Sequence, residues 1–150
     1  MMRTFFILVT CIYLIGFTPI TMAANHVCSQ KESQEAESVV AIVKSWGQSH
    51  QQFQRYVNCD DGAIAEGFSE SISILLAEHW GDISRLGEII KSDSSFHKFV
   101  IKHIDETVPV ERLIQISNNA SKRCPRNLKK LCRDIEVASK ANSDSAPLKH

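Results

Sequence analysis

The fold is decided at Tyr56–Phe68, YVNCDDGAIAEGF, where paired carboxylates stand just before an apolar-periodic run. Asn58, Asp60 and Asp61 occupy the positions at which the first amides of a helix need side-chain acceptors. Carboxylates there also favour the positive end of the helix dipole, by about 0.3–1 kcal/mol each when exposed. We therefore predict that these residues cap a helix.

A calcium site and an acid–base pair are the alternatives for the carboxylates of this stretch, and spacing argues against both. An EF-hand loop separates its acidic ligands along the chain, whereas Asp60 and Asp61 are adjacent. Glu66 and Glu70 share a helix face, as a pair for glycoside hydrolysis would. That face lies about 200° round the helix from Ile64, so we expect it to be solvated and unsuited to general acid catalysis.

Gly67 lies inside this helix, where glycine costs about 0.5–1 kcal/mol relative to alanine. Ala63, Gly67 and Ser71 recur every four residues and form a stripe of small side chains on one face. Such a stripe allows another helix to approach closely. We expect a neighbour from the same chain to pack there, and a partner's helix is the alternative occupant.

Every segment outward from this helix has helical periodicity, and none alternates as a strand does. The apolar seams predict a compact all-α bundle of about six helices at residues 36–140, with the first running from Val39 to Val57. Residues 25–35 are polar, and the tail 141–150 is polar with a proline, so both are expected to be flexible. A domain of this size has a modest core, which disulfides would stabilise.

Residues 1–24 predict a secretory signal peptide. Arg3 supplies the positive start, Phe5–Phe17 the apolar segment, and TPITMAA the small residues for cleavage after Ala23 or Ala24. The apolar segment is shorter than the roughly 20 residues of a transmembrane helix. We therefore expect cleavage, a periplasmic or secreted protein, and no transmembrane anchor in its mature form; an uncleaved anchor is the alternative.

Cleavage leaves four cysteines, and an even number predicts two disulfides in an exported protein. These are Cys28, Cys59, Cys124 and Cys132. If a helix starts at Pro125, the last two lie about 12 Å apart along its axis, too far for one disulfide. We then expect Cys59 to bond to one of them and Cys28 to the other. If the helix starts at Asn127, a local Cys124–Cys132 bond becomes feasible. Zinc is disfavoured because the spacings do not form a C-x2-C framework.

Charge is balanced over the whole chain but not along it. Residues 60–93 carry eight acidic and two basic side chains, whereas residues 112–133 carry seven basic and no acidic ones. The second segment contains a candidate binding patch for an acidic protein, an anionic envelope surface or a polyanion. This basic patch comprises Lys122, Arg123, Arg126, Lys129, Lys130 and Arg133.

The alternative for the basic patch is an internal role. In this interpretation the basic segment lies near the acidic helix, and a disulfide from Cys59 ties it there. We favour this interpretation because surface charge usually serves solubility. We expect no nucleic-acid partner, because no aromatic residue interleaves the basic run.

Three histidines, His50, His79 and His103, fall on the predicted apolar seams. If their helices converge, they could hold a metal ion or form a pH-responsive cluster, in a small metal-binding protein or hydrolase. The chain has no HExxH pair and no G-x-S-x-G motif, and buried histidines bonded to the backbone or to carboxylates are commoner. We therefore assign no catalytic residue, metal ligand or cofactor.

The segments YVNCDDGAIAEGF, LLAEHW, FVIKHID and CPRNLKKLC resemble small exported bacterial proteins with a YxxCDDGxxxEGF segment, over roughly residues 55–136. The resemblance brings no activity with it and transfers no functional residue. The helical plan is also similar to that of small periplasmic proteins that neutralise others, such as immunity proteins against cell-wall-degrading toxins. We favour an exported protein that acts by protein–protein binding, as an inhibitor or an envelope accessory protein, over an enzyme.

Overall fold

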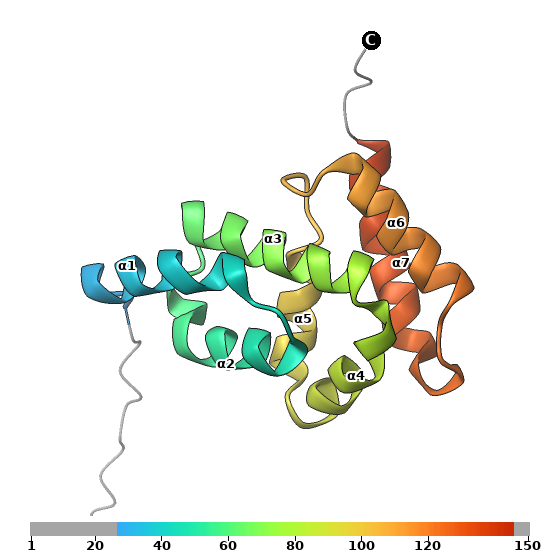
Figure 1. The fold of residues 1–150 in the computed structure, drawn as a ribbon, viewed down its shortest axis with the longest axis horizontal. Coiled ribbons are helices and arrows are strands. Elements are labelled where there is room, and N and C mark those ends of the chain that lie inside the picture. The colour runs from blue at the N-terminus through green and yellow to red at the C-terminus, as the bar shows by residue number, and fades with distance from the viewer. Residues whose placement is uncertain (1–26, 146–150) are drawn as a thin grey trace, which may run out of the picture.

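A computed structural model describes residues 27–145, which form seven α-helices, short 3-10 turns and no strand (Figure 1). The α-helices are α1 (Gln30–Val39), α2 (Trp46–Tyr56), α3 (Gly62–Glu78), α4 (Ile83–Ser92), α5 (Ser94–Lys102), α6 (Val110–Lys122) and α7 (Lys129–Asp144). The 3-10 turns are η1 (Val40–Ile42), η2 (Val57–Cys59), η3 (Trp80–Asp82) and η4 (Arg126–Leu128). The all-α, disulfide-containing fold class is confirmed.

The predicted signal peptide at residues 1–24 lies outside the part of the chain that the structure describes. Within residues 27–145, no helix has the length and apolar character needed to cross a membrane.

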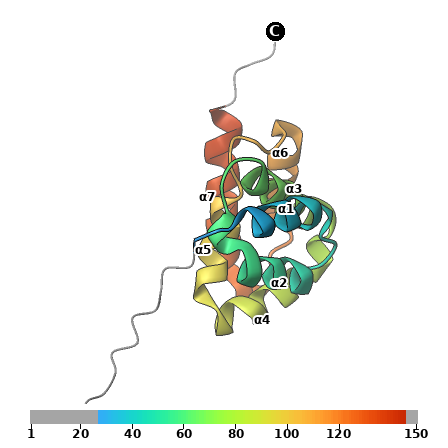
Figure 2. The same cartoon turned by 90° about the vertical axis from the view of Figure 1, so that its left-hand side faces the viewer.

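α3 is the central helix, and Asp61 caps it as predicted. The Asp61 backbone is extended and its carboxylate accepts a hydrogen bond from the Gly62 amide at 2.8 Å. Gly62 has a φ of 50°, in the left-handed region that glycine adopts at little cost. α1 and α2 lie beside the first part of α3, and the α6–α7 pair lies at its other end (Figures 1 and 2).

Side chains of α6 donate hydrogen bonds to the last carbonyls of α3. The Asn119 Nδ2 donates to the carbonyls of Leu76 and Ala77 at 3.0 and 2.8 Å. The Gln115 Nε2 donates to the carbonyl of Ala77 at 3.0 Å. Because the last carbonyls of a helix have no intrahelical partner, these bonds fix α6 against α3.

Two glycines allow close packing against helices. A Cβ on Gly67 would lie 2.7 Å from Cγ2 of the fully buried Val40, so η1 crosses α3 at the small-residue stripe. The expected close neighbour from the same chain is confirmed, although it is a short turn. Gly87 of α4 plays the same part for Leu128 of η4, whose Cδ2 would lie 2.5 Å from such a Cβ.

Phenylalanines from three helices fill the centre of the core. They are Phe53 of α2, Phe68 of α3, and Phe96 and Phe99 of α5. Phe99 lies between Phe53 and Phe68, with ring centroids 4.7 and 4.8 Å away. This cluster brings α2, α3 and α5 together and sets where the histidines beside it lie.

α1 corrects the expectation that residues 25–35 are flexible, because this helix begins at Gln30. Ser29 and Glu32 form a capping box: the Ser29 Oγ accepts from the Glu32 amide, and the Glu32 carboxylate accepts from the Ser29 amide. At the other end of the chain, α7 continues to Asp144, past the predicted limit of residue 140.

The predicted first helix, Val39–Val57, is also interrupted. Val43 has an extended backbone, and Ser45 starts α2 by accepting a hydrogen bond from the Gln48 amide. Serine favours such caps because its short hydroxyl reaches the free amides of the first turn. The seam continues through the break, since Val43 is buried on one side of it and Trp46 on the other.

The disulfides are Cys28–Cys59 and Cys124–Cys132. All four predicted cysteines are used, but the favoured pairing of Cys59 with Cys124 or Cys132 is wrong. α7 begins at Lys129, later than Pro125, so Cys124 precedes the helix and folds back to within 6.0 Å (Cα–Cα) of Cys132. The local bond that we left as the alternative is the one found.

Candidate functional site

The three histidines of the predicted seams do not meet in one site. His79 is exposed because α3 ends just before it, so its place on an apolar seam was wrong. His50 bonds to Asp93 at 2.9 Å, whereas His103 is buried at the end of α5. Within residues 27–145, no group of three His, Cys, Asp or Glu side chains is placed to hold a metal ion.

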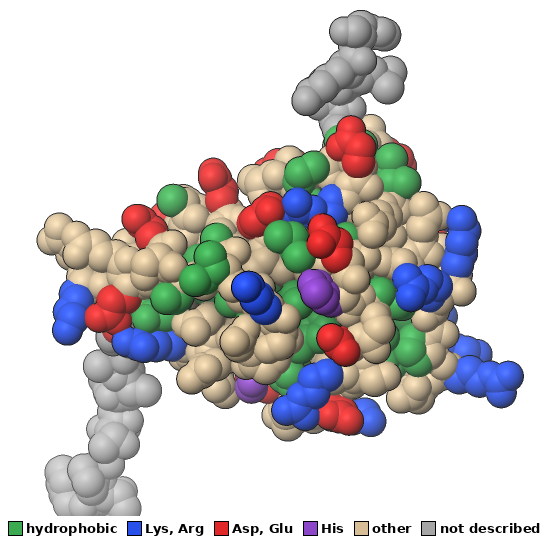
Figure 3. Space-filling model, viewed as in Figure 1, with side chains coloured by type: hydrophobic (Ala, Val, Ile, Leu, Met, Phe, Trp, Pro, Cys, Tyr) green, Lys and Arg blue, Asp and Glu red, His purple; other side chains and the backbone are tan. Residues whose placement is uncertain are grey.

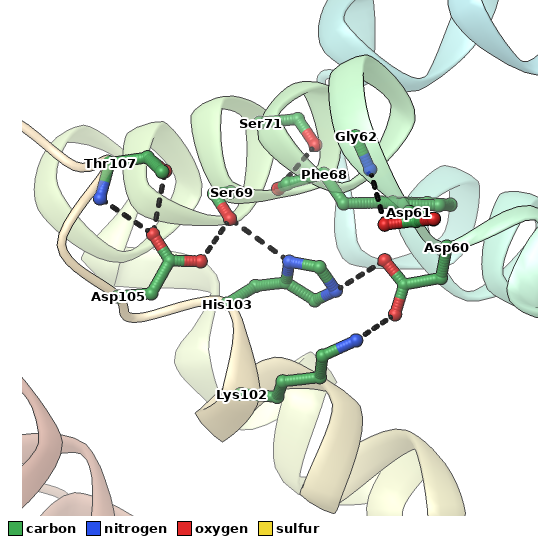
Figure 4. Close-up of polar contacts among 10 residues, drawn as sticks. All are labelled: Asp60, Asp61, Gly62, Phe68, Ser69, Ser71, Lys102, His103, Asp105 and Thr107. Atoms are coloured by element: carbon green, nitrogen blue, oxygen red, sulfur yellow. Dashed lines mark hydrogen bonds and ion pairs between the residues drawn. The ribbon is translucent and has the colours of Figure 1, made fainter.

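Asp60 does not cap α3, in contrast to the prediction, but lies against the end of α5 (Figure 4). Its side chain is only 7% exposed. One carboxylate oxygen lies 3.2 Å from the His103 Nε2, and the other lies 2.5 Å from the Lys102 Nζ. Asp60 therefore joins the loop before α3 to α5.

The second ring nitrogen of His103, Nδ1, faces α3 and the loop after α5 (Figure 4). The His103 Nδ1 lies 3.0 Å from the Ser69 Oγ, which lies 2.6 Å from a carboxylate oxygen of Asp105. Thr107 donates its amide and its hydroxyl to the second oxygen of Asp105, at 2.9 and 2.6 Å. Asp60, Ser69, His103 and Asp105 form what we call the buried polar cluster.

The hydroxyl proton of Ser69 sets the direction of the hydrogen bond between Ser69 and His103. Ser69 has one hydroxyl proton, and it goes to Asp105, because an ionised carboxylate can only accept. The His103 Nδ1 must then donate to Ser69, while Nε2 faces the carboxylate of Asp60. The imidazole of His103 therefore lies between the Asp60 carboxylate and the hydroxyl of Ser69, which links it to the Asp105 carboxylate.

The two carboxylates are held in their charged form. Burial raises the pKa of Asp60, but the hydrogen bonds from His103 and Lys102 outweigh burial and leave that pKa below its usual value. Burial also raises the pKa of Asp105, and hydrogen bonds from Ser69 and Thr107 bring it below its usual value. At neutral pH both carboxylates of the cluster are therefore ionised.

The buried polar cluster places a serine, a histidine and an aspartate in contact, but it lacks the features of a nucleophilic site. Ser69 is 1% exposed, so substrate has no access to its hydroxyl. The hydroxyl proton of Ser69 is also directed to Asp105, and the His103 Nδ1 donates to the Ser69 oxygen, so His103 is not placed to accept that proton. The arrangement instead fixes the loop before α3, α3 itself and the end of α5 to one another.

The sequence interpretation missed the buried polar cluster because its members are far apart along the chain. Ser69 and Asp105 were assigned no role, and Asp60 was read as a cap. One signal was present: FVIKHID ends an apolar helix with His103 and Asp105, two residues apart. Asp60, next to an aspartate that already serves as the cap, was the available partner.

Glu70 also departs from the expected solvated face. Its carboxylate accepts from both terminal nitrogens of Arg112, at 2.6 and 3.2 Å. Glu66 is exposed, as predicted. Glu70 therefore helps to hold α6 on α3, and Arg112 supplies one contact between the basic segment and the acidic helix.

The basic patch lies at the α6–α7 end of the molecule, where Figure 3 shows Lys and Arg side chains gathered along the right-hand edge. All six of its residues are exposed. Lys130 bonds to Asp134 at 2.7 Å, and it is the one patch residue with an acidic partner among residues 27–145. Because Cys59 bonds to Cys28, the favoured interpretation that a disulfide from Cys59 ties this segment to the acidic helix is wrong.

No known protein family, curated protein or solved structure matches this chain. The resemblance of YVNCDDGAIAEGF and the related segments to exported bacterial proteins therefore stays a prediction.

Proposed function

We propose that this protein is exported and acts by binding another protein, with the basic patch as its contact surface. The observation that supports this is the state of the patch: five of its six cations have no acidic partner within residues 27–145 and all are exposed. Cations without an acidic partner in the fold can pair with an acidic surface of another protein, which steers association and sets its register.

The frame beneath the patch is held by a disulfide and by buried contacts, which favours binding. The Cys124–Cys132 disulfide closes the turn between α6 and α7. The Trp80 indole donates to the carbonyl of Arg123 at 3.0 Å, and Leu128 is buried beside Gly87. A preorganised surface loses less conformational entropy on binding, so more of the contact energy appears as affinity.

Two disulfides support export, because such bonds persist in oxidising compartments and are rare in reducing ones. With the predicted signal peptide, they favour a periplasmic or secreted protein. A role as an inhibitor or as an envelope accessory protein fits a small rigid domain with one charged face. An anionic envelope surface is the competing partner for the same cations.

Capture of the partner from the native host tests this function. The patch variant replaces Lys122, Arg126 and Lys129 by glutamine. The control variant replaces Lys31, Lys44 and Lys140 by glutamine, which removes the same charge from elsewhere on the exposed surface. We expect the wild type and the control to retain one stoichiometric protein partner and the patch variant to lose it, with binding that weakens as salt rises.

Two results would contradict the proposal. One is a patch variant that keeps the partner as well as the control does. The other is the absence of any protein partner, together with patch-dependent binding to vesicles that contain anionic lipid. The second result would make the envelope surface the partner.

A further inference from the structure

A groove runs between α5 and α7 beside the basic patch. Its volume is about 670 Å³, and its walls include Lys98 and Ile101 of α5 and Arg133, Val137 and Ala138 of α7. A second hollow of about 230 Å³ shares His97 and Lys130 with it and reaches α4. The two hollows therefore lie on either side of His97 and Lys130.

The groove exposes apolar surface. Val137 is 63% exposed, although Leu131 and Ile135 on the inner face of the same helix are buried. Ile101 and Ala138 pack against the core and remain partly exposed. When a partner covers an apolar floor of this kind, the binding free energy becomes more favourable by about 25 cal/mol for each Å² of apolar surface removed from water.

The edges of the groove are positive. Asp134 is the single acidic residue of its lining, and it is already paired with Lys130 at 2.7 Å and with the His97 Nε2 at 3.2 Å. Lys98 and Arg133 have no acidic partner in residues 27–145, and neither has Lys91 in the second hollow. An occupant with carboxylates on both sides of an apolar stripe would complement this arrangement.

The shape of the groove and the sequence of the chain ends limit the kinds of molecule that can occupy the groove. The groove is concave and lies between two helices, which suits a rod such as an α-helix better than a flat membrane. Its α7 wall extends from Lys130 to Ala138, about 12 Å or two helical turns. Residues 1–26 and 146–150 contain no Asp or Glu, so neither segment supplies the complementary charge.

We propose that the α5–α7 groove binds an acidic amphipathic helix of a partner protein. Apolar residues of that helix cover Ile101 and Val137, and its flanking carboxylates pair with Lys98 and Arg133. This inference rests on the proposed function, since it names the part of the partner that is recognised. It adds a contact site, because Lys98, Ile101 and Val137 lie outside the basic patch.

Selection from a random peptide library displayed on phage tests the chemistry of the occupant. The library is selected on the wild-type protein and counter-selected on the Val137→Glu variant. We expect enriched peptides with apolar residues at helical spacing and Asp or Glu beside them. Enrichment of basic peptides, of peptides without this pattern, or of none would overturn the inference.

The affinity of an enriched peptide then locates its site. We expect V137E, and separately K98E/R133E, to raise the Kd by about tenfold or more in about 0.15 M salt. Substitution of Lys122, Arg126 and Lys129 by glutamine, outside the groove, should change the Kd by less than about threefold. All these side chains are exposed, so the variants should keep the circular dichroism of the wild type. Equal weakening by both sets would mean general charge attraction and would overturn the groove.

Other occupants give different results. Binding to anionic vesicles that V137E abolishes would indicate a lipid surface, and a dimer that V137E dissociates would indicate a second copy; either result overturns the inference.

Capture of the native partner by each variant distinguishes a failure of this inference from a failure of the proposed function. If the patch variant loses that partner while V137E and K98E/R133E keep it, the groove fails and the proposed function stands. If every variant keeps it, both fail.

Discussion

At the scale of single residues, Asp60 and Asp61 show how neighbouring side chains of one chemistry take different roles. Asp61 is exposed and accepts from the Gly62 amide at the start of α3. Asp60 turns inward and pairs with His103 and Lys102. The difference follows from the turn between η2 and α3, which leaves one carboxylate outside and brings the other against α5.

Asp60→Asn should therefore lower the free energy of unfolding far more than Asp61→Asn. The first substitution removes the buried carboxylate that faces His103 and Lys102, and breaking a buried ion pair in this way costs about 3 kcal/mol or more. The second keeps a capping side chain on an exposed residue, so the change should stay below about 0.5 kcal/mol. Urea unfolding at pH 7 measures both, and a loss below about 0.5 kcal/mol for Asp60→Asn would show that the Asp60 carboxylate has no structural role.

Gly67 and Gly47 provide a matched pair of helical glycines. A Cβ at Gly67 would press on Val40, which is β-branched and fully buried, whereas a Cβ at Gly47 meets no atom within 4 Å. We expect Gly67→Ala to destabilise the protein by about 1–3 kcal/mol. Gly47→Ala should be neutral or stabilise it by up to about 1 kcal/mol. Thermal unfolding compares the two, and a stabilising Gly67→Ala would contradict the close approach of η1.

At the scale of elements, the two disulfides have different tasks. Cys28–Cys59 spans 31 residues and ties the start of α1 to the turn before α3. Cys124–Cys132 spans 8 residues and holds the turn between α6 and α7. The first bond closes a larger loop, so it removes more entropy from the unfolded chain.

Replacing each cysteine pair by alanine should separate these tasks. Loss of Cys28–Cys59 should lower the free energy of unfolding by about 3–4 kcal/mol, and loss of Cys124–Cys132 by about 2–3 kcal/mol. Chemical unfolding without reductant measures both values. The reverse order would mean that α1 adds little to the stability of the rest of the fold.

At the scale of the whole molecule, carboxylates that hold separate elements together make the fold sensitive to acid. The hydrogen bonds from Ser95 and His50 lower the pKa of Asp93 to about 2, and the pKa values of Asp60 and Asp105 are also lowered. A carboxylate with a lowered folded pKa stabilises the fold above its unfolded pKa of about 3.9. That stabilisation is lost as the pH falls through the folded pKa.

The free energy of unfolding should therefore fall as the pH drops from about 5 to about 2. Asp93→Asn should flatten part of this dependence, because asparagine retains a capping oxygen but does not titrate. Urea unfolding across this pH range gives both curves. Parallel curves for the wild type and Asp93→Asn would show that Asp93 does not contribute to the acid sensitivity.

Four features follow from the sequence alone: the all-α class, the cysteines that form disulfides, the cap at Asp61 and the close packing at Gly67. Each depends on periodicity or on residues a few positions apart, which act within one helix or turn. The tertiary structure decided the disulfide pairing, the place of Asp60 and the α5–α7 groove. The buried polar cluster joins Ser69 to His103 across 34 residues, and such contacts depend on how the helices pack around the phenylalanine core. Packing of this kind leaves no periodic trace in the chain, because each partner alone looks like an ordinary polar residue of a helix or a loop.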